Sequence, residues 1–74
     1  MMTTKYIIQM KMPSRSDLDY YYRGQSREGN PVFDLKRLAA KRYDYIEEAY
    51  RALSILSVVE RDETLTVVPI KCRT

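Results

Sequence analysis

The stretch that decides the fold is Lys5-Tyr6-Ile7-Ile8-Gln9-Met10-Lys11-Met12, near the start of the 74-residue chain. Its apolar side chains alternate with a more polar set, the apolar positions being Tyr6, Ile8, Met10 and Met12. This two-residue period predicts a half-buried β-strand, because successive side chains of a strand point to opposite faces of the sheet. Pro13 ends the predicted strand.

Three further strands are predicted downstream. The segment Asp19 to Arg23 contains three consecutive tyrosines, whose rings pack well on a pleated surface. A segment with both glycines of the chain then predicts a turn, so that the chain returns as a short strand through Val32 and Phe33 and forms a hairpin. The last strand, Thr64 to Arg73, contains Pro69, and a residue without an N–H group predicts an edge strand or a bulge there.

One main helix is predicted over Tyr45 to Ser57, with apolar residues at helical spacing at Ile46, Ala49, Tyr50, Leu53 and Leu56. Asp44, with Glu47 three residues later, predicts an N-cap for this helix. Asp34 predicts a second N-cap, before a short helical turn from Leu35 to Ala40.

The alternative is a single continuous helix from Leu35 to Ser57. That helix would put Arg42 on the apolar stripe and would leave Asp44 unused as a cap. We therefore favour a break at Lys41 to Tyr43, where a short extended piece would join the two helical segments.

These elements predict an α+β fold in β-β-β-α-β order, formed by residues 1–74 as a single domain. A small antiparallel sheet of three to four strands carries the main helix on one face and leaves the other face open. A sheet of this size needs a helix or a second subunit to be stable, so a homodimer is an alternative way to cover it.

The composition argues against catalysis and against a cofactor. The chain has no histidine and a single cysteine, Cys72, which excludes Cys/His zinc sites and histidine-based catalysis, and its two glycines form no phosphate-binding loop. No metal and no cofactor are expected. The lone cysteine and the absence of a signal peptide or an apolar span predict a cytoplasmic protein that has no membrane partner.

Charge is polarised along the chain, with a balance of +5 over residues 1–43 and −2 over residues 44–74. If the strands alternate regularly, and a bulge at Pro69 turns Ile70 and Cys72 inward, the open face of the sheet becomes basic. The predicted partner-binding residues on that face are Lys5, Lys11, Tyr21, Arg23, Lys71 and Arg73. Two basic pairs around the first helical turn are the secondary candidates: Lys36, Arg37, Lys41 and Arg42.

The order of elements resembles a loose group of small phage and mobile-element proteins, on four short motifs: Lys5-Tyr6-Ile7-Ile8, Tyr21-Tyr22-Arg23-Gly24, Ala40-Lys41-Arg42-Tyr43 and Glu47-Glu48-Ala49. Some phage proteins of this size inhibit host defence complexes, as anti-CRISPR proteins do. The resemblance implies a non-enzymatic binding protein that inhibits a host protein or a protein–nucleic-acid complex. The alternative is a small accessory domain that binds nucleic acid directly through a basic, tyrosine-containing sheet face.

Overall fold

The computed structural model describes residues 1–59 and 64–73 and confirms the predicted α+β fold. Four antiparallel strands form one sheet in the order β3-β2-β1-β4. The elements are β1 (Met2–Met12), β2 (Arg15–Gln25), β3 (Pro31–Asp34), the 3₁₀ turn η1 (Arg37–Ala39), α1 (Ile46–Val59) and β4 (Thr64–Arg73). The charged residues 60–63, between the main helix and the last strand, also predict a turn, and this turn lies outside the described residues.

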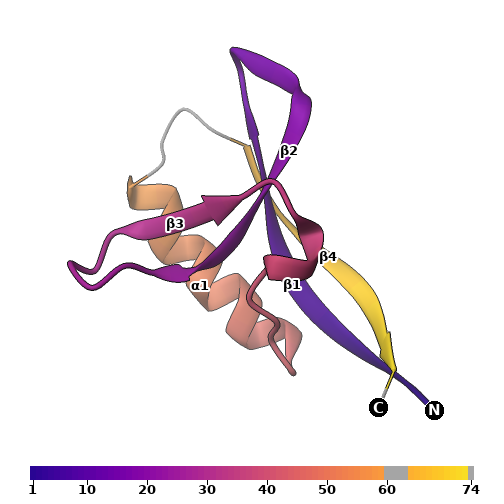
Figure 1. The fold of residues 1–74 in the computed structure, drawn as a ribbon. Helices are drawn as coiled ribbons and strands as arrows, with labels where there is room; N and C mark the ends of the chain where they lie inside the picture. The colour runs from indigo at the N-terminus through magenta and orange to yellow at the C-terminus, as the bar shows by residue number, and fades with distance from the viewer. Residues whose placement is uncertain (60–63, 74) are drawn as a thin grey trace.

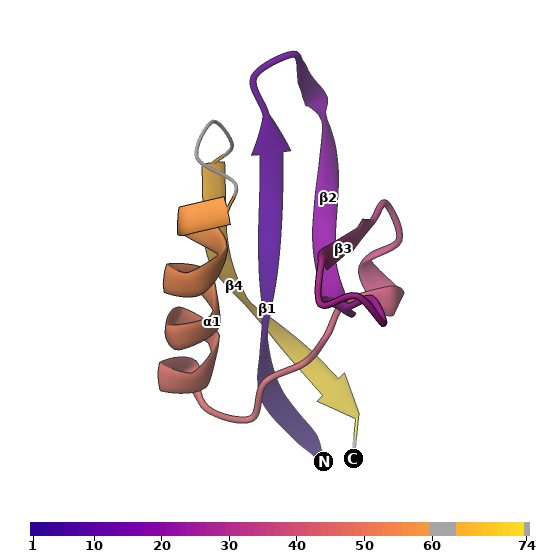
Figure 2. The same cartoon turned by 90° about the vertical axis from the view of Figure 1, so that its left-hand side faces the viewer.

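The central strand is β1, which pairs with β2 on one side and with β4 on the other. It begins three residues earlier than predicted, and its two faces are both covered, since Ile7 and Ile8 are each 0% exposed. The prediction that the second face is open is therefore wrong at this strand. Figures 1 and 2 show the reason: α1 and η1 lie on opposite sides of the sheet.

The main core lies between α1 and the sheet. Ile8, Tyr22 and Leu56 form its buried centre, and partly buried apolar side chains from β3, β4 and α1 pack around it. The ring of Tyr22 contacts that of Phe33 with centroids 5.7 Å apart. Burial of this apolar surface is the main favourable contribution to folding, because apolar side chains gain most when they leave water.

The predicted break between two helical segments is confirmed, and Tyr43 forms an extended bridge within it. Tyr43 exchanges two backbone hydrogen bonds with Tyr6 of β1, at N···O distances of 2.9 and 2.8 Å. The N–H of Lys41 donates to the carbonyl of Tyr22 at 2.8 Å. Residues 41–43 therefore fill the place beside β1 that β2 leaves as it bends away.

The two predicted N-caps are wrong in their positions. α1 begins at Ile46, and the carbonyl of Tyr45, not Asp44, accepts the first helical hydrogen bonds. The pairing of Tyr43 with Tyr6 brings Asp44 next to Lys5, and its carboxylate forms an ion pair with that ammonium group. Asp34 accepts the N–H of Lys36 at 2.8 Å, one residue before η1 begins.

Pro69 lies in an edge strand, as predicted, but without a bulge. The register of β1 and β4 runs without a shift from Met2↔Arg73 to Lys11↔Thr64, with Pro69 opposite Tyr6. Tyr6 directs both of its backbone hydrogen-bonding groups to Tyr43, so its pairing with Pro69 uses no hydrogen bond and the Pro69 nitrogen faces outward. The missing N–H therefore costs the sheet nothing.

Within residues 1–59 and 64–73, glycines occupy both positions of positive φ. Gly24, with φ of 132°, lies where the register of β2 and β3 shifts, and Gly29, with φ of 84°, lies in the turn between these strands. Residues with a Cβ rarely adopt these conformations, so the bend of β2 depends on glycine.

Candidate functional site

A hollow of about 410 Å³ lies between η1 and the end of β4. We call it the basic hollow; its lining residues are Arg37, Leu38, Arg42, Ile70, Lys71, Cys72 and Arg73. Four consecutive residues of β4 line it, from Ile70 to Arg73. By register, Ile70 and Cys72 lie on the Lys5 side of the sheet, and Lys71 and Arg73 lie on the other side. The lining of the hollow combines cationic residues from two segments, residues 37–42 and residues 71–73, that are far apart in the sequence.

Backbone hydrogen bonds place the arginines of the hollow. Arg42 lies between Lys41 and Tyr43, whose main chains are bound to β2 and β1. Arg37 begins η1, a turn held by the hydrogen bond from the N–H of Ala40 to the Arg37 carbonyl. The main chain around Arg42 is therefore attached to the sheet, whereas Arg37 lies in a turn held by its own hydrogen bonds.

The electrostatics of the hollow are one-sided. Among the described residues, no Asp or Glu lines it. Arg37, Arg42 and Arg73 have no carboxylate partner within the described part of the chain, and Lys71 donates only to the hydroxyl of Thr4, at 2.9 Å. Four cationic residues in the lining, with no described carboxylate among them, make the surroundings of the hollow positive, which favours an anion.

The predicted basic sheet face does not form as expected. Lys5, Lys11 and Tyr21 do share one face by register, but each basic residue on it has an acidic neighbour. Besides the pair of Lys5 with Asp44, Lys11 lies 3.5 Å from a carboxylate oxygen of Asp19, and Arg23 lies 3.4 Å from one of Asp34. Tyr21 is half-buried. These pairs cancel much of the charge that the sequence predicted for that face.

The prediction that Lys71 and Arg73 join that face is wrong, because it required the bulge at Pro69. In the observed register Lys71 is opposite Thr4 and Arg73 is opposite Met2, on the other face of β1 from Lys5. Ile70 and Cys72 are half-buried on the Lys5 side instead.

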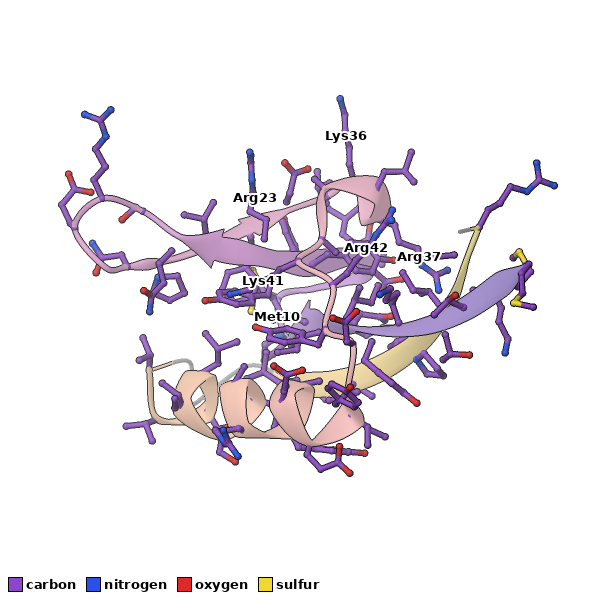
Figure 3. All side chains as sticks on the ribbon, turned by 90° about the horizontal axis from the view of Figure 1, so that it is seen from below. Met10, Arg23, Lys36, Arg37, Lys41 and Arg42 are labelled. Carbon is purple, nitrogen blue, oxygen red and sulfur yellow. The ribbon has the colours of Figure 1, made fainter. Side chains whose placement is uncertain are left out.

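The secondary candidates divide between two surfaces. Arg37 and Arg42 line the hollow, whereas their sequence neighbours Lys36 and Lys41 do not. In Figure 3, Lys36 and Arg23 point away from α1. The ammonium group of Lys41 lies 5.4 Å from the ring centroid of Tyr43, at cation–π distance. Each basic pair therefore contributes one arginine to the hollow.

A second groove, of about 470 Å³, lies between α1 and the β2–β3 hairpin. Tyr22, Tyr43, Leu56 and other apolar side chains line it together with Lys41, Glu48 and Arg51, so its charges are mixed. Burial raises the pKa of Tyr43 above its usual value of 10.0, and the neighbouring Tyr22 and Glu48 raise this pKa further. The Tyr43 phenol is therefore neutral at physiological pH.

Among residues 1–59 and 64–73, no group of three or more metal-binding side chains occurs, and no helix is long and apolar enough to cross a membrane. Comparison with family models, curated proteins and solved structures finds no match to this chain. The basic hollow is therefore the candidate functional site.

Proposed function

We propose that this protein is a non-catalytic nucleic-acid-binding module that holds the phosphate backbone in the basic hollow. The observation that supports the proposal is a hollow whose lining includes Arg37, Arg42, Lys71 and Arg73 and no described carboxylate. A phosphodiester backbone carries one negative charge per nucleotide, which suits a site lined by several cationic residues. A cytoplasmic location, which stays a prediction, would give the protein access to nucleic acid.

The type of cation also favours phosphate. Three of the four charged residues are arginines, whose planar guanidinium groups donate two parallel hydrogen bonds to phosphate oxygens. None of these three arginines has a described carboxylate that would compete with the ligand. A ligand can therefore bind these three guanidinium groups without first breaking an ion pair.

The experiment measures binding of a labelled short duplex and of a labelled single strand by fluorescence anisotropy across a series of salt concentrations. Each neutralised phosphate contributes about −0.9 to the slope of log K against log salt on duplex DNA. We expect the double variant Arg42→Gln/Arg73→Gln to bind more weakly, with a slope that is smaller in magnitude by roughly 2.

Lys11→Gln is the matched control, because it removes a positive charge that already has Asp19 as its neighbour. This control should leave the slope unchanged. If wild-type protein binds neither nucleic acid at low salt, or if the control and the double variant lose the same slope, the hollow is not a phosphate site.

The sequence also predicts that this protein inhibits a host defence complex, and that function stays a prediction. The same hollow would also fit an acidic protein surface, since complementary charge guides protein association as well. Affinity capture from host cells separates the two partners: a stoichiometric protein partner that survives nuclease treatment favours the inhibitor, and loss of all partners favours nucleic-acid binding.

A further inference from the structure

The helix α1 carries more apolar surface than the sheet covers. Most of its residues are apolar, yet among its described residues only Ala49 and Leu56 are buried. Ile55 is 63% exposed and Val59 is 59% exposed, and both line the groove between α1 and the β2–β3 hairpin. A helix that is apolar around most of its circumference is usually covered on more than one side. The groove side of α1 therefore has the composition of a covered surface.

We propose that α1 and this groove form the interface of a symmetric dimer, in which α1 of each copy covers the groove of the other. The residues that α1 contributes to the groove are spaced three or four positions apart, which places them on one face of the helix. We call this face the groove stripe: Glu48, Arg51, Ala52, Ile55 and Val59. Two helices pack well through stripes of this spacing, because the side chains of one fit between those of the other. The inference goes beyond the proposed function and does not depend on it.

The charges of the groove stripe favour a second copy as the occupant of the groove. In a two-fold interface the same patch contacts itself, so the patch must complement its own charges. Glu48 and Arg51 carry opposite charges one helical turn apart, and neither forms an ion pair within the described part of the chain. When two such helices pack antiparallel and cross between these two positions, Glu48 of each copy lies opposite Arg51 of the other. The apolar Ile55 of each copy then lies near the start of the other α1.

The exposed area of the chain matches what a dimer of ordinary size needs. The chain exposes 5487 Å². A folded monomer of 8.8 kDa exposes about 4,800 Å² by the usual scaling of surface with mass. The excess of about 700 Å² is close to the roughly 800 Å² that each partner buries in a standard interface. The chain therefore has surplus surface for one such interface.

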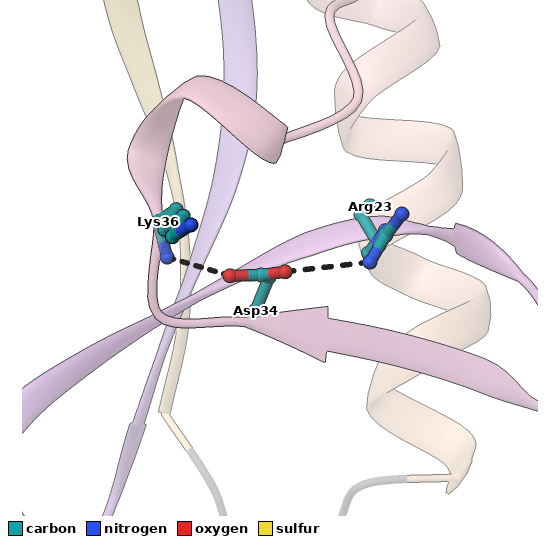
Figure 4. Close-up of polar contacts among 3 residues, drawn as sticks. All are labelled: Arg23, Asp34 and Lys36. Atoms are coloured by element: carbon teal, nitrogen blue, oxygen red, sulfur yellow. Dashed lines mark hydrogen bonds and ion pairs between the residues drawn. The ribbon is translucent and has the colours of Figure 1, made fainter.

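The opposite wall of the groove is the β2–β3 hairpin, whose two strands are tied together (Figure 4). The guanidinium group of Arg23 on β2 lies 3.4 Å from the carboxylate of Asp34 on β3, and the same carboxylate accepts the N–H of Lys36 at 2.8 Å. Tyr22 of β2 lines the groove and packs in one cluster with Leu56 of α1. A groove with walls held in this way loses little conformational entropy when a partner binds, which favours affinity.

A dimer formed through α1 leaves the basic hollow open in both copies. α1 and η1 lie on opposite sides of the sheet (Figures 1 and 2), and among the described residues the hollow and the groove share no lining residue. Self-association can therefore be measured without nucleic acid, and its failure would leave the proposed function unaffected.

The first test measures self-association by sedimentation velocity over a series of protein concentrations. We expect a wild-type dimer that dissociates on dilution. Ile55→Glu should weaken it about 100-fold or more, because each copy would place an unpaired carboxylate in the interface. Leu35→Glu is the matched control, since it adds the same charge at an apolar side chain that is 54% exposed and does not line the groove. This control should leave self-association unchanged, and circular dichroism checks that both variants fold.

The second test exchanges charges, which separates a second copy from a foreign partner. Arg51→Glu would set carboxylates of the two copies against each other and should weaken the dimer about 10-fold or more. The double variant Glu48→Arg/Arg51→Glu again places opposite charges across the two-fold axis and should recover the wild-type association. A foreign surface would keep its original charges, so an interface with a foreign protein would not recover in this way.

Each outcome decides for or against the dimer. Self-association that is lost in Ile55→Glu, kept in Leu35→Glu and recovered in the double variant supports the inference. A wild-type monomer across the whole concentration series overturns it. A dimer that Ile55→Glu leaves intact also overturns it, because the copies would then meet through another surface. If the double variant does not recover what Arg51→Glu loses, α1 does not pack against its own copy and the inference is wrong.

Discussion

Replacing Leu56 with alanine removes the apolar contact that α1 makes with the centre of the core. Leu56 is 5% exposed and packs in one cluster with Ile8 and Tyr22. Leucine-to-alanine changes at buried sites cost about 2–5 kcal/mol, from lost burial and from the cavity that remains. With roughly 0.05–0.15 kcal/mol per residue, a 74-residue domain has only about 4–11 kcal/mol of total stability.

We therefore expect Leu56→Ala to lower the free energy of unfolding by about 3 kcal/mol and the Tm by roughly 12–24 °C. Urea unfolding followed by circular dichroism measures the first quantity, and a thermal scan measures the second. Leu38→Ala is the matched control, since it makes the same chemical change at a site that is 86% exposed and should shift stability by less than about 0.5 kcal/mol.

The two leucine variants refute the packing argument if they behave alike. Equal losses at positions 56 and 38 would mean that the exposed turn contributes as much as the helix face. A Leu56→Ala protein within about 0.5 kcal/mol of wild type would mean that α1 does not pack on Ile8 as described. The slope of unfolding free energy against urea should remain the same in both variants, because the surface exposed on unfolding hardly changes.

Two further predictions concern Tyr43 and Pro69. Because the pKa of Tyr43 is raised in the folded state, its neutral form contributes stability below the unfolded value, and this contribution is lost as pH rises through the folded pKa. Absorbance titration should show one tyrosine ionising later than the others, and this late component should be absent in Tyr43→Phe; its persistence would assign the shift to another tyrosine. Pro69→Val would supply an outward N–H in the middle of the exposed β4 edge, so we expect a folded protein that self-associates more than wild type in sedimentation velocity. A variant that sediments as wild type does at equal concentration would show that Pro69 does not protect this edge.

The elements with strong periodicity were predictable from the sequence. β4 has the predicted bounds, and α1 is displaced from its predicted bounds by one to two residues. Both elements were predictable because β-branched residues favour a strand, and an apolar stripe at helical spacing favours a helix, through neighbouring residues alone. The strand β2 is longer than predicted, starting at Arg15, since the polar residues after Pro13 are typical of a turn. Only pairing with β1, which sets Met12 opposite Arg15, extends the strand that far.

The candidate site was predictable only in its parts. The sequence singles out Arg37, Arg42, Lys71 and Arg73 as basic candidates, but it cannot show that they line one hollow. The lining brings residues 37–42 together with the end of β4, which pairs with β1 in a register free of a bulge. Leu38 was missed because an apolar residue in a short helical segment is usually buried; its exposure arises from η1 being a single turn.

The pairing of β1 with β4 also has a consequence for how the chain folds. Met2 is opposite Arg73, so the longest strand pairing joins residues that are about seventy positions apart and closes nearly the whole chain into a loop. Long-range pairings of this kind slow folding, because the entropy of loop closure is lost before the contacts form. Joining the two ends and opening the chain in the turn at residues 26–30 would make β4 and β1 a local hairpin. Such a circular permutant would keep the same sheet, and the pairing of β1 with β4 would no longer require closure of a long loop during folding.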